Sequence, residues 1–175
     1  MPPENEIPTW DNRPIEVAAI LNPAFCGVLL IDVLKSYYEN NEKIGMSYPL
    51  AFLVLPIILH KGTRDILPGA KSSITLADWF ENTWLTHYIH PEFVERTRYL
   101  VPYTKEAIIF SMWQGFIQFK QANLIPTEKQ YLQANFSWEK NSEPSQYREK
   151  AKFLGRWLAQ TGSPMRVFNI LRINL

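Results

Sequence analysis

One apolar segment limits what this chain can fold into more than any other feature of the sequence. Asn22-Pro23 predicts the N-cap and first position of a helix that runs to about Asn40. The first half of this helix is apolar on every side, so other parts of the chain must surround it. The longest apolar runs, 25–31 and 50–59, are shorter than the roughly 20 residues that a membrane span needs. Both are therefore predicted to be core helices, and we expect no membrane contact.

Length and composition place the protein in a broad class. The chain has 175 residues, of which 46% are hydrophobic and 14% aromatic, so it is predicted to form one folded domain. The single cysteine, Cys26, excludes an internal disulfide. A formal net charge of +1 argues against binding of polyanions by overall charge. The first residues do not resemble a signal peptide, so we expect a cytoplasmic protein.

The pattern along the chain predicts a mainly α protein of the α+β kind, a compact multi-helix domain with one small β-hairpin. Residues 1–12 are acidic and proline-containing and are predicted to form an extended arm, followed by a single domain over 13–175. A break at 101–104 predicts the start of a central helix that runs to Gln121. Alternating apolar residues at 132–138 predict a strand that pairs with 123–125, giving a hairpin at about 123–139. A helix followed by a hairpin also fits a winged-helix-like core.

Basic residues are the candidate binding groups. Residues 142–162 are predicted to form a helix that packs inward through Tyr147, Ala151, Leu154 and Leu158. The same spacing predicts that Arg148, Lys152 and Arg156 face outward as one basic ridge. Lys61 and Arg64 form a second basic group near a predicted helix end. These five residues fit either a solvated surface or a docking site for an acidic partner or phosphates.

The sequence carries no recognised catalytic motif. The sequence has no glycine-rich phosphate loop, no nucleophile elbow and no zinc-protease motif. His87, His90 and Glu92 have a spacing that a metal site can use, but histidines in such an aromatic loop more often bond to backbone groups. Cys26 lies in the all-apolar half of a helix, where a thiol is usually inert. We therefore expect no enzyme activity and no cofactor.

Four segments, 13–26, 48–64, 100–107 and 152–163, carry a resemblance to a known family. In this order they resemble the small middle component of bacterial three-component ABC ATPase conflict systems, the Lamassu type of antiphage defence. The resemblance implies a non-catalytic subunit that bridges an SMC- or Rad50-like ABC ATPase and an effector, often a nuclease. It also implies that any contact with DNA is made indirectly, through the complex.

Two other functions remain open from the residues alone. The first is a winged-helix-like protein that binds nucleic acid directly, although its candidate recognition helix carries lysines only at its ends, Lys105 and Lys120. The second is a small hydrolase with an unrecognised site. Salt-dependent DNA binding by the isolated chain would favour the first of these, and stoichiometric co-purification with the products of neighbouring genes would favour the assembly subunit.

Overall fold

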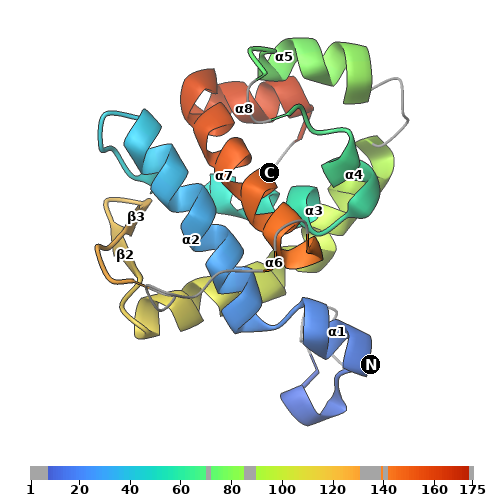
Figure 1. Ribbon diagram of the computed structural model, residues 1–175, viewed down its shortest axis with the longest axis vertical. Helices are drawn as coiled ribbons and strands as arrows, with labels where there is room; N and C mark the ends of the chain where they lie inside the picture. The colour runs from blue at the N-terminus through green and yellow to red at the C-terminus, as the bar shows by residue number, and fades with distance from the viewer. Residues whose placement is uncertain (1–7, 70–71, 85–89, 131–138, 140–141, 174–175) are drawn as a thin grey trace.

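The computed structural model describes residues 8–69, 72–84, 90–130, 139 and 142–173. It is mainly helical with one small antiparallel sheet, which confirms the predicted fold class (Figure 1). The helices are α1 (Ile15–Ile20), α2 (Pro23–Asn40), α3 (Val54–Ile58), α4 (Lys61–Asp65), α5 (Leu76–Trp79), α6 (His90–Trp113), α7 (Glu143–Thr161) and α8 (Pro164–Leu171). The other elements are the 3₁₀ turns η1 (Trp10–Asn12) and η2 (Tyr48–Leu53), the π-helical turn η3 (Phe80–Trp84), and the strands β1 (Met46–Ser47), β2 (Ile117–Lys120) and β3 (Asn123–Pro126).

The central helix of the fold is α2, and its predicted bounds are confirmed. The side chain of Asn22 accepts hydrogen bonds from the backbone N–H groups of Ala24 and Phe25, and Pro23 occupies the first helical position. Helices α6 and α7 both pack on α2 (Figure 1). The prediction that residues 104–121 form the central helix is therefore wrong. The first half of α2 is apolar on every side and so needs neighbours on more than one side, and α6 and α7 are such neighbours.

Two glycines let the neighbouring helices approach α2 closely. Gly155 of α7 lies so near α2 that an added Cβ atom would be 2.2 Å from the carbonyl oxygen of Val33. On another side of α2, a Cβ atom added to Gly27 would be 2.6 Å from the Oγ atom of Ser111 in α6. Ser111 Oγ is buried and has no hydrogen-bond partner in the part of the chain that the structure describes. Backbone therefore packs directly against backbone at the α2–α7 contact, whereas a side chain fills the gap at the α2–α6 contact.

The N-terminal helical segment also passes a test for membrane-spanning helices. Residues Ile15–Asn40, which include α1 and α2, are long and apolar enough to cross a membrane by length and composition. A buried core helix passes the same test, so the expectation of no membrane contact stays a prediction. In the folded chain, Leu21 and Asn22 separate α1 from α2, and α2 buries half of its residues against the rest of the protein. Helix α2, unlike α1, therefore has the environment of a core helix.

Helix α6 runs without a break through the predicted boundary at 101–104. Phe93, Leu100 and Ala107 are buried on one side of it, at intervals of seven residues that span Pro102. The hydroxyl of Thr104 donates to the carbonyl oxygen of Leu100 inside the helix and does not cap a new one. Proline removes one backbone hydrogen bond, and packing of the continuous apolar face outweighs that loss.

The end of α6 and the hairpin after it differ from the prediction. Gly115 has a φ of +75°, and the N–H groups of Gly115 and Phe116 bond to the carbonyls of Met112 and Ser111, as in a Schellman motif. The helix therefore stops at Trp113. Residues 117–120, predicted to be helical, form β2, which pairs with β3 in a sheet of order β1-β3-β2. The part of β3 at 123–125 was predicted correctly, and its expected partner at 132–138 lies outside the described residues.

The C-terminal helices close the core as predicted. Ser142 caps α7, Gly162 ends it with a φ of +98°, and Ala151, Leu154 and Leu158 are buried. Two tryptophans, Trp79 of α5 and Trp157 of α7, hold α5 and its flanking residues against α7. The indole N–H of Trp79 donates to Ile66, that of Trp157 donates to Ile74, and the two rings pack edge to face with centroids 5.2 Å apart.

Candidate partner-docking site

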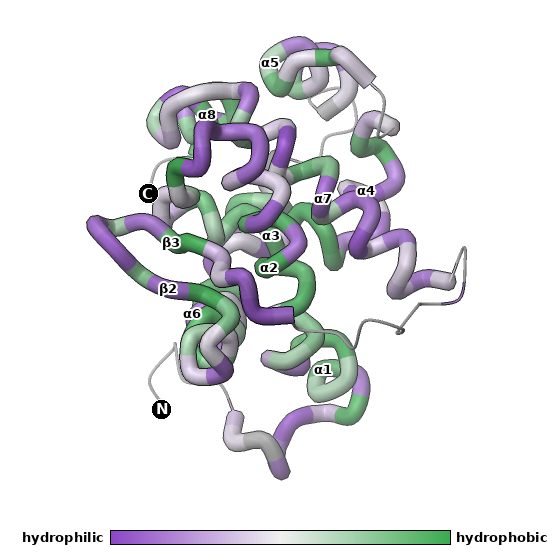
Figure 2. Tube along the Cα trace, turned by 60° about the vertical axis from the view of Figure 1, so that its left-hand side comes forward, coloured by the Kyte–Doolittle hydropathy of each residue, from purple (hydrophilic) through white to green (hydrophobic). Residues whose placement is uncertain are grey.

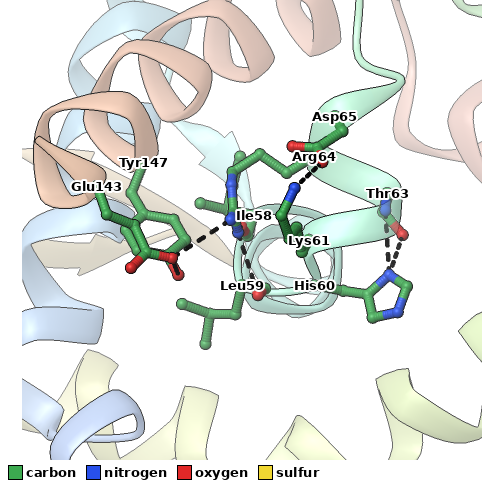
Figure 3. Close-up of polar contacts among 9 residues, drawn as sticks. All are labelled: Ile58, Leu59, His60, Lys61, Thr63, Arg64, Asp65, Glu143 and Tyr147. Atoms are coloured by element: carbon green, nitrogen blue, oxygen red, sulfur yellow. Dashed lines mark hydrogen bonds and ion pairs between the residues drawn. The ribbon is translucent and has the colours of Figure 1, made fainter. Parts of the chain in front are cut away.

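Arg64, one of the predicted docking residues, lies at the junction of α3, α4 and α7 (Figure 3). Its Nη1 atom donates to the carbonyl oxygens of Ile58 and Leu59, at 2.8 and 3.2 Å, where α3 ends. A guanidinium at this place satisfies free carbonyls and opposes the negative end of the helix dipole. Arg64 is buried, so the structure assigns it to the interior and not to an exposed docking surface.

The N-terminal turn of α7 covers Arg64. The guanidinium carbon of Arg64 lies 4.1 Å from the centre of the Tyr147 ring, and Glu143 forms an ion pair with Arg64 at 3.6 Å. The Tyr147 hydroxyl donates to Glu143 at 2.7 Å. Burial, followed by this hydrogen bond, raises the pKa of Tyr147. The phenol therefore remains a proton donor, and the three side chains join α4 to α7.

His60, next to this junction, caps α4 with its imidazole ring. Nδ1 accepts a hydrogen bond from the backbone N–H of Thr63 at 3.1 Å and lies 2.8 Å from the Thr63 hydroxyl (Figure 3). Arg96 of α6 donates to the same hydroxyl at 3.0 Å. Burial and the charge of Arg96 lower the pKa of His60. The cap needs an unprotonated Nδ1, because this atom accepts the hydrogen bond. The charge of Arg96 disfavours a second positive charge on His60 and so favours the neutral ring that the cap requires.

Arg148 does not face outward, so the predicted ridge on α7 is wrong at this position. Its Nε and Nη2 atoms donate to the two carboxylate oxygens of Asp32 in α2, at 2.6 and 3.0 Å. The Asp32 side chain is only 2% exposed and that of Arg148 is 15% exposed. A carboxylate buried in an apolar helix requires a charged partner. The ion pair therefore holds α7 on α2.

The remaining predicted residues do not form one surface. Lys152 and Lys61 are exposed, and Lys61 pairs with Asp65 one turn along α4. Arg156 is half-buried, with its guanidinium 5.4 Å from the centre of the Phe153 ring. The five predicted residues are thus divided between interior contacts and separate exposed positions. A docking role for Lys61, Lys152 and Arg156 stays a prediction.

Sequence reasoning missed three residues of this region. Asp32 binds Arg148, and the ring of Tyr147 covers Arg64. Lys150 donates to the carbonyl oxygens of Leu67 and Pro68, which follow α4. One signal was present for Asp32, because an acid directly after the apolar run 25–31 and followed by Val33 and Leu34 predicts a buried basic partner. Periodicity predicted that Tyr147 packs inward, but not that it contacts Arg64, and no sequence signal points to Lys150.

The candidate metal and thiol groups were also compared with the structure. Among the described residues, no group of three or more His, Cys, Asp or Glu is placed to hold a metal ion. The side chains of His87 and His90 lie outside that part of the chain. Cys26 is fully buried in α2, and burial raises the pKa of its thiol to about 12. This environment matches the predicted inert thiol.

Comparison with known proteins identifies the family. Neither the curated proteins nor the solved structures gave a match. A family model, however, matches residues 10–175, which is nearly the whole chain and includes every element from η1 to α8. Its description is Middle Component 3 (MC3) of ABC-three component (ABC-3C) systems. The chain therefore belongs to the MC3 family of ABC-3C middle components.

Proposed function

We propose that this protein is a non-catalytic assembly subunit that bridges an SMC- or Rad50-like ABC ATPase and a nuclease-type effector in a cytoplasmic antiphage defence complex of the Lamassu type. The observation that carries the proposal is membership of a middle-component family across nearly the whole chain. A middle component works together with the other components of its system. In this proposal the subunit holds the effector inactive until the ATPase engages foreign DNA.

The structure offers surfaces suited to protein contacts. Among the described residues, ten large hydrophobic side chains are exposed, and Trp113 is 82% exposed. Aromatic residues are enriched at the cores of protein interfaces. The nucleic-acid alternative rested on a helix at 104–121 followed by a hairpin at about 123–139. The structure has instead a hairpin of β2 and β3 after α6, and the expected strand at 132–138 lies outside the described residues. The C-terminal part of α6, however, exposes Ile109, Met112 and Trp113, where a groove-reading helix needs hydrogen-bonding side chains, and the exposed bases Arg98 and Lys105 lie farther back in the helix. This arrangement favours a protein partner over DNA.

Co-expression with the two neighbouring reading frames tests the proposal. A tag on this chain is expected to recover both other components in fixed stoichiometry, before and after nuclease treatment and in 0.5 M NaCl. The isolated chain is expected to bind neither ATP nor zinc stoichiometrically. Recovery of the tagged chain alone, together with salt-dependent DNA binding, would instead support the nucleic-acid alternative.

The regulatory part of the proposal needs a separate assay. Effector activity on DNA is measured in the complete complex and in a complex assembled without this chain. We expect effector activity to come under control of the ATPase only when this chain is present. Equal activity with and without the chain would refute the regulatory role and leave the assembly role in place.

A further inference from the structure

Helix α1 differs from the other described helices in how little of it is buried. Four of its six residues are exposed, and the other two, Val17 and Ala18, are only half-buried. Each of the other described helices buries at least two side chains. Figure 2 shows α1 near the lower edge of the molecule, below α2 and α7. Burial of apolar surface therefore contributes little to holding α1 in place.

The length of α1 does not make it stable by itself either. An isolated helix of fewer than about 12–15 residues is marginal in water, because the first turn costs more free energy than one or two further turns return. Pro14, at the N-cap position of α1, has no side-chain acceptor for the first N–H groups. The helix therefore depends on contacts made outside it.

Arg13 makes the strongest of these contacts. Its guanidinium donates to both carboxylate oxygens of Glu106 in α6, at 2.9 and 3.1 Å, and lies 5.6 Å from the centre of the Tyr103 ring. Its Nε atom donates to the carbonyl oxygen of Pro8 at 3.0 Å. The Arg13 side chain is 3% exposed and that of Glu106 is 31% exposed. This bidentate ion pair attaches the start of α1 to α6.

The other end of α1 is a hinge that the sequence fixes. Proline restricts the residue before it to extended backbone, and Asn22, before Pro23, has a φ of −62° and a ψ of 125°. Helices α1 and α2 therefore cannot join into one helix. The cap of α2 lies within residues 22–25, so it does not depend on α1. Leu21 is buried and marks the boundary between the two helices.

An open apolar groove separates part of α1 from the rest of the protein. It has a volume of about 330 Å³, and Val17 and Ile20 of α1 line it together with Leu59 and Leu100. Protein interiors leave few gaps larger than a water molecule. The groove shows that α1 is incompletely packed, so its detachment breaks few apolar contacts.

We propose that α1 is a strap that detaches from α6 and unfolds as a unit, hinged at Leu21 and Asn22, with the Arg13–Glu106 ion pair as its catch. Local openings of this kind occur where few buried contacts hold a segment. The rest of the fold stays intact when the strap opens, and the groove wall formed by Leu59 and Leu100 becomes accessible. The strap therefore controls access to this wall, whatever the other components of the system are.

Hydrogen exchange of backbone amides, followed by NMR in the folded chain, tests the proposal. The amides of Ala18 and Leu21 are bonded to the carbonyl oxygens of Pro14 and Val17. After correction for intrinsic rates they are expected to exchange at least about 100-fold faster than the buried amides of α2, because the strap opens without the core. Equal protection of α1 and α2 would show that α1 opens only with the whole fold, and would overturn the proposal.

Two variants show whether the ion pair is the catch. Glu106→Gln removes a contact that is absent both in the strap-open state and in the unfolded state, so exchange should become faster by the same factor in α1 and α2, about tenfold. Ile31→Val weakens the core, which stays folded when the strap opens. Exchange should therefore become about fivefold faster in α2 and stay unchanged in α1. Arg13→Lys keeps the charge but loses the bidentate geometry, and it replaces Glu106→Gln if that variant does not fold.

The exchange patterns separate the alternatives. If Glu106→Gln makes exchange faster in α2 but not in α1, the strap opens without breaking the ion pair, and the assignment of the catch is overturned. If Ile31→Val makes exchange faster in α1 as well, α1 opens together with the core, and the strap is overturned. The matched control is Asp65→Asn, which removes the carboxylate of the exposed Lys61–Asp65 pair and is expected to leave both helices unchanged. None of these results bears on the proposed function, which concerns the other components.

Discussion

Replacement of Gly155 by alanine is expected to force α7 away from α2 and to destabilise the fold. The new Cβ atom would lie 2.2 Å from the carbonyl oxygen of Val33, and the N atom of Tyr37 is only 3.0 Å away. Contacts of a Cβ atom stay beyond 3.0 Å, so the two helices must separate by about 0.8 Å. We take the cost of this separation from the upper end of the range for overpacked cores, about 3 kcal/mol. Alanine returns about 1 kcal/mol through helix propensity. The free energy of unfolding should fall by about 2 kcal/mol.

Urea denaturation followed by tryptophan fluorescence measures this loss, which corresponds to a decrease of about 4–8 °C in thermal midpoint for a chain of this size. Gly27 supplies the control. A Cβ atom at Gly27 meets only Ser111 Oγ closely, with the next atoms at 3.8 Å. Gly27→Ala combined with Ser111→Ala should therefore be neutral or stabilise by up to about 1 kcal/mol. If Gly155→Ala is tolerated as well as this double variant, the argument from backbone contact is refuted.

Three further predictions concern buried or capping groups. Arg148→Ala should destabilise the protein by about 3–5 kcal/mol, because it leaves Asp32 buried without its partner; a loss below about 1 kcal/mol in urea denaturation would contradict a desolvated pair. The lowered pKa of His60 means that the cap on Thr63 contributes its full stability above pH 6.5 and loses it as the pH falls through the folded-state pKa. His60→Asn keeps a hydrogen-bond acceptor that does not titrate, so the urea midpoint of this variant should depend less on pH between 7.5 and 5 than that of the parent. The same pH dependence in both proteins would exclude the cap. Cys26 should resist thiol reagents at pH 8 until the protein unfolds, as followed by mass spectrometry, and rapid labelling of the native protein would contradict its burial.

Local signals predicted those elements whose ends are encoded in adjacent residues. The cap at Asn22 gave the start of α2, and that at Ser142 gave the start of α7. The prediction failed where packing between distant segments decides the outcome. Pro102 is a local stop signal, yet α6 continues because its apolar face is buried on both sides of the proline. At the other end of α6, Gly115 carried a usable stop signal that the helical pattern of the neighbouring residues obscured.

The candidate site was predicted less well than the fold, for a related reason. Periodicity assigns side chains to the faces of a helix, and it correctly grouped Ala151, Leu154 and Leu158. It carries no information about what lies opposite each face. Arg148 was assigned to solvent because its partner, Asp32, is 116 residues away in the sequence. The apolar pattern at 104–121 likewise predicted a central helix, although Ile109, Met112 and Trp113 of α6 are exposed, because a pattern of apolar residues does not show which of them other parts of the chain cover.

The position of α2 between α6 and α7 has a consequence for synthesis of the chain. Val33 contacts Gly155, so the ribosome must add 155 − 33 = 122 residues before the most apolar helix can meet its closest neighbour. At about 5–20 residues per second this takes about 6–24 s. Throughout that time the all-apolar half of α2 has no complete burial site. We therefore expect the incomplete chain to be prone to aggregation until α7 has been made.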